Sequence, residues 1–324
     1  MLFYFLMLIP MLILSILLSI SSHSWMMIWM GMEVNLIVFI MINLLYKNLF
    51  TMESSMKYFL IQSLGSLIFL VSLSFNSMMY EEWPYLYMYS LPMAMMLKSG
   101  LSPFHSWTPE VISKMSYLTI FLFLTLQKLV PLTISFCSWM EILMMSSLLN
   151  IIVGSIGGMI QSSLIKILIF SSMSNAGWMI ISLSESFMLF MMYFVLYMMM
   201  TSMIMITLSA IKLKWMIQLK SISKMEKIMF YCLFFSFSGL PPFLGFTPKW
   251  MILDNMHMHL PLTASLCILT SLMTMFFYLK SSMTMLFLVN LNNKWATQFT
   301  NFELSNVLML TINFTGIPMF FILT

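Results

Sequence analysis

Apolar runs long enough to cross a membrane recur along almost the whole chain. A spanning α-helix needs roughly 20 apolar residues, and hydropathy predicts eleven such spans in the 324 residues. They cover residues 2–20, 25–45, 56–75, 86–107, 115–136, 139–159, 162–183, 187–211, 228–253, 260–279 and 306–323. With 61% hydrophobic and 7% charged residues, the chain lacks the polar surface of a water-soluble domain. We predict one all-α polytopic membrane domain over residues 1–324.

The choice of residue types indicates where the gene resides. The chain has 14 lysines, no arginine and 43 methionines, although arginine suits a membrane interface as well as lysine does. The bias is typical of an AT-rich mitochondrial genome that reads an additional codon as Met. An AT-rich bacterium would explain all of it except the Met content. We predict a multi-pass protein of the mitochondrial inner membrane, with residues 2–20 as a retained helix rather than a cleaved presequence.

The distribution of lysine predicts the orientation of the chain. Loops on the negative side of an energised membrane collect Lys, and the connection 212–227 holds five lysines, so we place it in the matrix. Alternation then places the N-terminus in the matrix and the C-terminus in the intermembrane space. The same predicted side receives Lys47, Lys57, Lys114, Lys166, Lys280 and Lys294. The opposite side receives Glu81, Glu82, Glu141, Glu185 and Asp254, and no lysine.

Several site types are excluded by spacing. The cysteines are Cys137, Cys232 and Cys267, which form no CxxC pattern for a cluster or a structural zinc. His257 and His259 share a short loop and read as solvated rather than as metal ligands. The GSIGG at 154–158 lies in an apolar run, which favours close helix packing over a phosphate cradle. The net charge of +4 comes from scattered lysines, which excludes nucleic-acid binding.

Four ionisable residues are left unexplained by this topology: Glu33, Lys98, Lys128 and Lys249. A charge at membrane depth costs about 2.5–3.5 kcal/mol on insertion scales and by default marks a functional site. The alternatives are a structural Lys–Glu pair or snorkelling of lysine to the interface. Snorkelling applies most readily to Lys249, which follows two prolines.

Each of these three lysines lies near a predicted helix break. The breaks are expected at Pro103, Pro131, Pro241 and Pro242. Proline removes a backbone donor, and in lipid the freed backbone is tolerated only where protein or a water-filled cavity satisfies it. Broken helices also recur at the ion sites of transporters. A plain packing kink is the alternative, and the threefold coincidence with lysine favours a functional reading.

The sequence resembles one family in six stretches that occur in family order. They are WMGMEVN at 29–35, ESSMKYFLIQSLGS at 53–66, MLKSGLSPFHSWTPEV at 96–111, LQKLVPL at 126–132, GSIGGMIQSSLIKILIFSSMSNAGWM at 154–179 and GLPPFLGFTPKW at 239–250. The family is the NADH–ubiquinone oxidoreductase chain 2 family, whose members are antiporter-like subunits of respiratory complex I. The layout is similar to the animal form, which lacks the first three helices of the bacterial homologue.

The resemblance implies roles for individual positions. The Glu of the WxGxExN helix and the Lys of the KSGxxPFHxW helix, which pair beside the channel in the family, fall on Glu33 and Lys98. The central Lys of the next helix falls on Lys128, and the exit-side Lys after GLPPFxGF falls on Lys249. The resemblance thus implies proton transfer through these four residues.

Three further positions are auxiliary candidates: His105, Lys166 and Asn175. Many relatives have His where this chain has Asn175, and Asn does not titrate. Either this position relays only through water, or the chain depends less on it.

The resemblance also implies what the chain binds. We expect no cofactor and no metal in this chain, and therefore no catalytic redox residue. The complex would use FMN, iron–sulfur clusters, NADH and ubiquinone in other subunits. Expected partners are the other membrane-arm subunits and phospholipid, including cardiolipin, and no nucleic acid. The alternatives are a free-standing or multisubunit secondary cation/proton antiporter and, with Asn175 as its support, a structural subunit with degenerate channel residues.

Overall fold

The described part of the chain is helical almost throughout, as the hydropathy predicts. The computed structural model describes residues 2–78, 84–136, 140–221, 224–259, 261–286, 311 and 313–316. Within these residues, eight helical segments are long and apolar enough to cross a membrane, and one of them, Tyr117–Ser135, consists of two consecutive helices. The all-α fold class is therefore confirmed. The predicted span 306–323 lies mostly outside the described residues, as do Cys137 and the side chains of His257 and His259.

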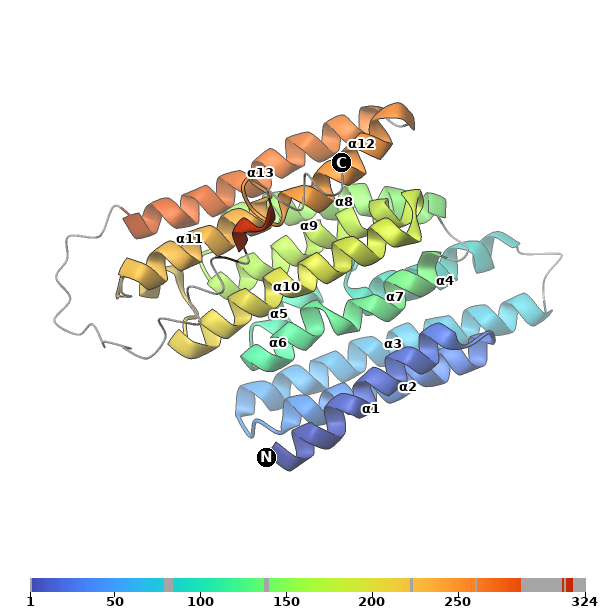
Figure 1. Cartoon of the computed structure of the whole chain (residues 1–324). Helices are drawn as coiled ribbons and strands as arrows, with labels where there is room; N and C mark the ends of the chain where they lie inside the picture. Colours follow the sequence, from blue (N-terminus) through green and yellow to red (C-terminus); the bar gives the residue numbers. More distant parts are fainter. Residues whose placement is uncertain are drawn as a thin grey trace. The chain divides into compact units, whose positions relative to one another are not determined.

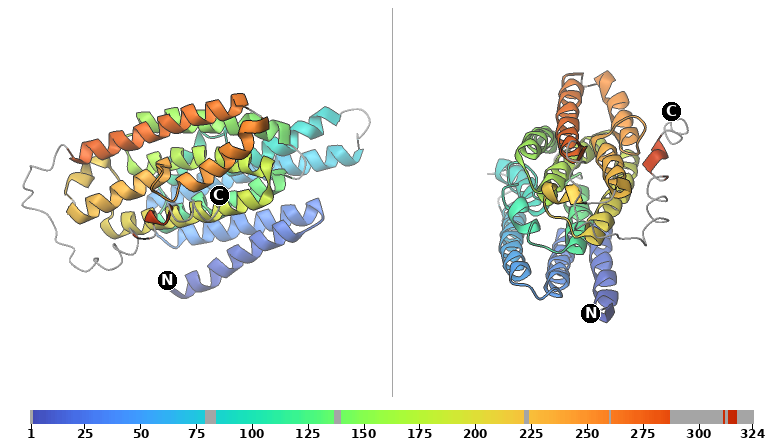
Figure 2. Two further views of the ribbon diagram at one scale, coloured as in Figure 1. Left: turned by 45° about the horizontal axis from the view of Figure 1, so that its top comes forward. Right: turned by 90° about the vertical axis from the view of Figure 1, so that its left-hand side faces the viewer.

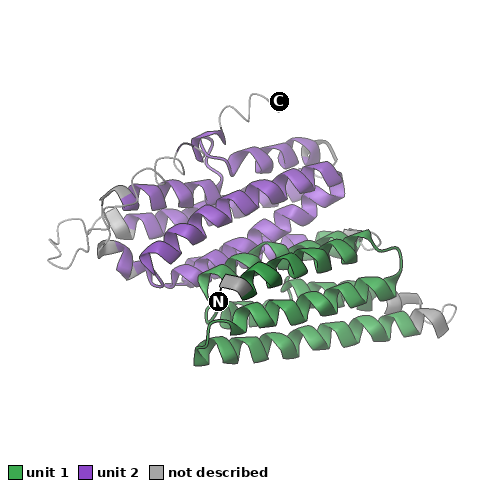
Figure 3. Ribbon diagram, turned by 60° about the horizontal axis from the view of Figure 1, so that its bottom comes forward, with its two compact units in different colours: residues 1–146 green, residues 147–324 purple. Residues whose placement is uncertain are grey.

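The chain divides into two compact units, Met1–Ser146 and Ser147–Thr324 (Figure 3). The helices of unit 1 are α1 (Leu2–Ser21), α2 (Trp25–Leu44), α3 (Leu49–Met78), α4 (Pro84–Ser99), α5 (Trp107–Ile112), α6 (Tyr117–Leu124) and α7 (Leu126–Phe136). Successive long helices pack side by side, α1 on α2, α2 on α3 and α3 on α4 (Figure 1). Helix α7 contacts both α1 and α4. Helices α1, α2 and α3 thus each pack against the next helix in the chain.

Unit 2 is built around one fully enclosed helix. Its elements are residues 147–160 of α8 (Met140–Ile160), α9 (Leu164–Glu185), α10 (Phe187–Ile211), the 3₁₀ helix η1 (Met216–Ser221), α11 (Lys224–Ser238), α12 (Phe246–His259) and α13 (Pro261–Leu286). Nearly every residue of α9 is buried. Helices α10 and α12 pack against α9, and α12 and α13 run side by side (Figure 2). A helix that is buried all round forms the core of its unit.

The glycines of the GSIGG stretch lie inside α8, where they permit close helix packing. A Cβ at Gly154 would lie 2.7 Å from the backbone nitrogen of Ser174 on α9. On the facing helix, a Cβ at Gly177 would lie 2.5 Å from Ile151 Cγ1. Small residues let membrane helices approach in this way, so the packing interpretation of this stretch is confirmed.

Two helix breaks follow the same hydrogen-bond pattern. Helix α4 ends at Ser99, where Leu101 N donates to Met96 O (3.0 Å) and Gly100 N donates to Leu97 O (3.3 Å). Helix α11 ends at Ser238 with the equivalent bonds around Gly239. Both glycines have positive φ, 69° and 81°, which completes a Schellman motif at each end. Pro103 lies in the segment after the first break, and Pro241 and Pro242 lie in the segment after the second.

The break expected at Pro131 is wrong in position. Pro131 lies inside α7, and the chain leaves the helix six residues earlier, at Thr125, whose φ and ψ are −110° and −83°. Proline acts on the carbonyl of residue i−4, here Gln127, through its missing N–H and its ring. That carbonyl lies two residues after Thr125, within α7, and Pro131 itself continues the helix.

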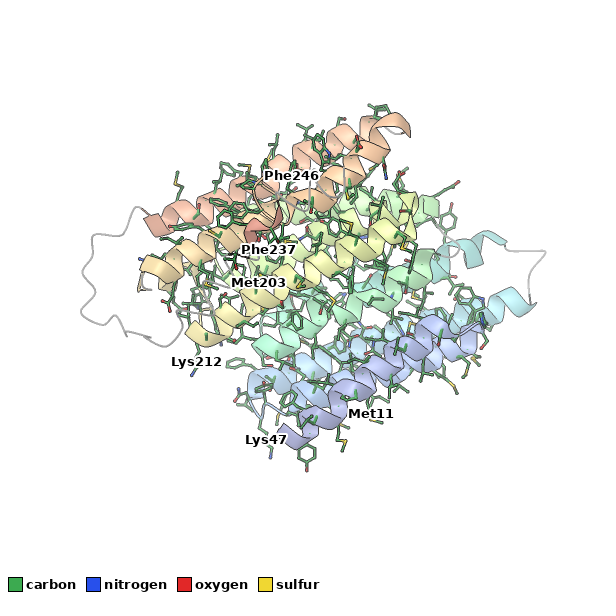
Figure 4. The ribbon with its side chains drawn as sticks, in the orientation of Figure 1. Met11, Lys47, Met203, Lys212, Phe237 and Phe246 are labelled. Carbon is green, nitrogen blue, oxygen red and sulfur yellow. The ribbon has the colours of Figure 1, made fainter. Side chains whose placement is uncertain are left out.

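Lysines that are distant in the sequence gather at one end of each unit. In unit 1, Lys57 and Lys114 both pair with Glu53 on the first turns of α3. Figure 4 shows Lys47 beyond the end of α2 and Lys212 at the end of α10. In unit 2, Lys280 Nζ donates to Met159 O near the end of α8 (3.4 Å). Within each unit, this grouping agrees with the side predicted for these residues.

Candidate functional site

Glu33 and Lys98 form an ion pair between α2 and α4. Glu33 Oε1 lies 3.8 Å from Lys98 Nζ, and their side chains are 27% and 5% exposed. Lys98 is in the last turn of α4, where the negative end of the helix dipole favours a cation. The structure therefore brings together the two residues that the sequence comparison predicts as a pair.

Helix α3 fixes the position of Lys98. Gln62 Nε2 donates to the backbone oxygen of Lys98 (2.9 Å) at the end of α4. Gly65, one turn further along α3, faces the lysine side chain so closely that a Cβ there would lie 2.9 Å from Lys98 Cγ. The ammonium also lies 3.9 Å from Met32 Sδ, a weak acceptor. The lysine is held by neutral contacts and one carboxylate.

A small cavity lies beside Lys98. Its volume is about 20 Å³, which is room for one water molecule. Its walls are formed by Met32, Asn35, Leu36, Tyr58, Gln62, Lys98, Gln127, Val130 and Pro131. Five of these nine residues carry polar groups, so the cavity suits water rather than an apolar ligand.

Asn35 and Gln127 bond to each other across this cavity wall. Asn35 Nδ2 donates to Gln127 Oε1 (3.2 Å), and Gln127 Nε2 donates to Asn35 Oδ1 (3.0 Å). The Tyr58 hydroxyl donates to the same Gln127 oxygen (3.4 Å). These three residues were missed as candidates because neither their charge nor their spacing marks them. The sequence does offer one signal for two of them, because the amides of Asn35 and Gln127 lie in the apolar runs that contain Glu33 and Lys128.

Lys128 lies in the first turn of α7, the helix that follows the Thr125 break. Its backbone nitrogen donates to Thr125 O (3.2 Å), and Lys128 as a whole is 4% exposed. Gln127 precedes it on the same turn of α7 and faces the cavity, whereas Lys128 is not part of the cavity wall. Lys128 is thus buried, and its sequence neighbour Gln127 lines the same cavity as Lys98.

Lys249 lies in unit 2 and caps the end of α11. Its Nζ donates to Phe237 O (3.4 Å) and Ser238 O (3.1 Å), the last carbonyls of that helix. The ammonium also lies 6.0 Å from the ring centre of Trp178, a cation–π distance. Lys249 is 8% exposed, so it does not snorkel out of its unit. Phe237 and Phe246, which flank the break, are labelled in Figure 4.

The auxiliary candidates have more ordinary surroundings. Asn175 is buried on α9, and its Oδ1 accepts a hydrogen bond from the Tyr193 hydroxyl (3.0 Å). His105 is half-buried, with Nδ1 3.2 Å from Pro103 O. Lys166 is half-buried on the first turn of α9, at the lysine-rich end of unit 2. Within the described residues of unit 1, His105 therefore does not join the Glu33–Lys98 pair, and Lys166 belongs to unit 2.

These features define a class of protein. A polytopic helical bundle with buried ionisable groups beside broken helices is typical of membrane proteins that move ions. Residues 22–277 match the family described as NADH:quinone oxidoreductase/Mrp antiporter, TM.

Two solved structures share this fold. A chain of respiratory complex I from Thermus thermophilus with bound aureothin is 20% identical, with a TM-score of 0.78 over 87% of this chain and 70% of that one. A chain of the Mrp complex from Dietzia is 15% identical, with a TM-score of 0.74 over 85% of this chain and 59% of that one. At these identities the likeness shows the fold.

Relatives with higher identity narrow the family. NADH-ubiquinone oxidoreductase chain 2 of Anopheles gambiae is 36% identical over 95% of this chain and 93% of its own length. The protein of the same name from Locusta migratoria is 35% identical over 86% of this chain and 84% of its own length. The chain belongs to the NADH-ubiquinone oxidoreductase chain 2 family, a family of complex I membrane subunits, and it is a multi-pass inner-membrane protein.

Proposed function

We propose that this chain translocates protons within respiratory complex I, and that Glu33, Lys98, Lys128 and Lys249 carry them. The observation that supports this most is the ion pair of half-buried Glu33 and buried Lys98, 3.8 Å apart beside a water-sized cavity. A cavity with polar walls next to a lysine is the arrangement that proton transfer through water requires. Glu33, as the more exposed partner, is the residue on which a neighbouring subunit acts.

The ion pair stores energy of the right size for this task. At an effective dielectric constant near 20, two charges 3.8 Å apart attract by about 4 kcal/mol, and at ~12 Å by about 1.4 kcal/mol. The difference, about 3 kcal/mol, matches the work of moving one charge through roughly 130 mV. Opening such a pair costs this energy and closing it releases the same amount, which is comparable to the work of moving one proton against a membrane potential.

Electron transfer belongs to other subunits in this proposal. They would hold FMN, the iron–sulfur clusters, NADH and ubiquinone, while this chain binds none of them and performs no redox step. The lack of CxxC and phosphate-loop patterns in the sequence supports this division. Exposed leucines on α1 support contact with phospholipid, including cardiolipin, and with other membrane-arm subunits; Leu6, Leu14, Leu17 and Leu18 are all more than half exposed.

We also propose that the chain lies in the mitochondrial inner membrane with its N-terminus in the matrix and its C-terminus in the intermembrane space. The lysine-rich connection 212–227 supports the matrix assignment of one side. Pairing of Lys57 and Lys114 with a common partner supports their placement on one side of unit 1.

The test is the proton-to-electron ratio of the assembled complex in liposomes. Lys98→Met removes the proton carrier and is expected to lower the ratio while the complex stays assembled. Lys57→Met is the matched control, because Lys57 pairs with Glu53 at the end of unit 1 and is 42% exposed. A full ratio in the Lys98→Met complex, or an equal loss in the Lys57→Met complex, contradicts the proposal.

A further inference from the structure

The amide pair of Asn35 and Gln127 is closed and neutral. Each side chain both donates to and accepts from the other, at 3.2 and 3.0 Å. The two residues are only 5% and 9% exposed, so water outside the protein does not compete for these bonds. These two bonds occupy one donor and one acceptor site of each amide, so the edges that face each other are not open to water.

Through Gln127, this pair joins the wall of the Lys98 cavity to α7, the helix that carries Lys128. Both amides belong to the cavity wall together with Lys98. Lys128 follows Gln127 directly in the chain, is buried, and does not line the cavity. A carboxamide does not titrate, so a proton passes it only by way of water.

Tyr58 offers Gln127 a partner when the pair opens. Its hydroxyl donates to Gln127 Oε1 at 3.4 Å, the oxygen that also accepts from Asn35. If Asn35 turns away, Gln127 keeps one bond and its NH₂ group becomes free for water. Opening then costs only the bonds between the two amides, each a neutral bond of modest net value.

We infer that Asn35 and Gln127 form a gate between Lys98 and Lys128. Closed, as in this structure, the gate separates the water beside Lys98 from Lys128; open, the freed amide groups orient water that connects the two lysines. The gate makes Asn35 and Gln127 positioning residues, which hold water and carry no proton themselves. This inference rests on the proposed function, because it assumes that protons pass from Lys98 to Lys128.

The experiment measures passive proton conductance of the assembled complex in liposomes, with an imposed pH gradient and no NADH. Gln127→Ala removes both mutual bonds and enlarges the cavity, so the conductance is expected to rise by about tenfold. That factor corresponds to about 1.4 kcal/mol, the net value of one or two neutral hydrogen bonds. Adding Lys98→Met to the Gln127→Ala chain is expected to abolish the increase.

Asn43→Ala is the matched control for structural damage. Asn43 is a buried amide on α2, the helix that carries Asn35. It bonds to Ser54 Oγ (3.1 Å) and to Thr119 Oγ1 (3.3 Å), and it is not part of the cavity wall. Its loss is expected to lower the thermal stability of the complex without any rise in conductance. An equal rise in the Asn43→Ala complex overturns the gate.

A double exchange separates the gate from simple loss of packing. Asn35→Gln with Gln127→Asn moves one methylene group across the pair and keeps both amides, so conductance is expected to stay at the level of the unaltered complex. The gate is overturned by unchanged conductance in Gln127→Ala or by a leak in the double exchange. Failure of the proposed function would appear separately, as undiminished NADH-driven pumping in the single Lys98→Met complex.

Discussion

Glu33 Oε1 and Lys98 Nζ lie 3.8 Å apart with no hydrogen bond between them, and the Glu33 oxygen has no hydrogen-bond partner among the described residues. Charge-assisted hydrogen bonds between such groups are about 2.7–2.9 Å long. The pair is therefore neither closed nor separated. Small movements of α2 or α4 change its energy in either direction, which suits a pair that responds to events in another subunit.

Gly65 sets the path of the Lys98 side chain, so Gly65→Ala is expected to lower the proton-to-electron ratio. The added Cβ would lie 2.9 Å from Lys98 Cγ and 3.4 Å from its Cε, which forces the ammonium away from its present place beside Glu33. Overpacking of this kind costs about 1–3 kcal/mol of stability. The ratio is measured with the assembled complex in liposomes.

Gly158→Ala is the control for crowding alone. Its Cβ would lie 3.0 Å from Phe277 Cε1, a comparable contact in unit 2 that meets a phenylalanine ring instead of a lysine side chain. Similar loss of thermal stability in both variants, with a lower ratio only in Gly65→Ala, is the expected result. A full ratio in Gly65→Ala would show that the position of Lys98 is not critical.

Lys249 has two separable tasks, which Lys249→Met and Lys249→Arg distinguish. Lys249→Met leaves Phe237 O and Ser238 O without their donor, and a buried unpaired acceptor costs about 1–3 kcal/mol. Lys249→Arg keeps a cation and donors but does not release its proton. We expect lower thermal stability only in Lys249→Met, and a lower proton-to-electron ratio in both complexes. Normal pumping by Lys249→Arg would restrict Lys249 to capping α11.

Asn175 is expected to act through its hydrogen bond alone. Asn175→Leu removes the acceptor of the Tyr193 hydroxyl and is expected to cost about 1–3 kcal/mol of stability, with the proton-to-electron ratio unchanged. Thermal unfolding of the complex and pumping are measured on the same preparation. Asn175→His is expected to retain both values, since a ring nitrogen also accepts this bond. Loss of pumping in a stable Asn175→Leu complex would mean that Asn175 relays protons.

The strong signals in this sequence were hydropathy and scarce charge. Helix α10 has the predicted bounds, 187–211, and α1 and α2 end within one residue of theirs. A charge inside an apolar run is costly in a membrane, which is why the sequence alone marks Glu33 and Lys98 as candidate functional residues. The predicted span 228–253 contains two helices, since a hydropathy window averages over the break between α11 and α12.

The weaker signals lay in neutral polar residues and in backbone geometry. The bond between Asn35 and Gln127 joins positions 92 residues apart, and nothing in either helix alone specifies it. Thr125 is where α6 ends, six residues before Pro131, whereas the carbonyl that Pro131 leaves without a donor is that of Gln127, inside α7. Proline predicts that a helix is disturbed, and the position of the disturbance depends on which carbonyl loses its partner.

A double-mutant cycle on the Glu33–Lys98 pair tests the central claim most directly. The proton-to-electron ratio is measured for complexes with Glu33→Gln, with Lys98→Met and with both changes. Residues that act as a unit show losses that do not add. The account predicts that the double variant pumps no worse than Lys98→Met alone. Losses that add across the two sites would show that Glu33 and Lys98 act independently, and would contradict the account.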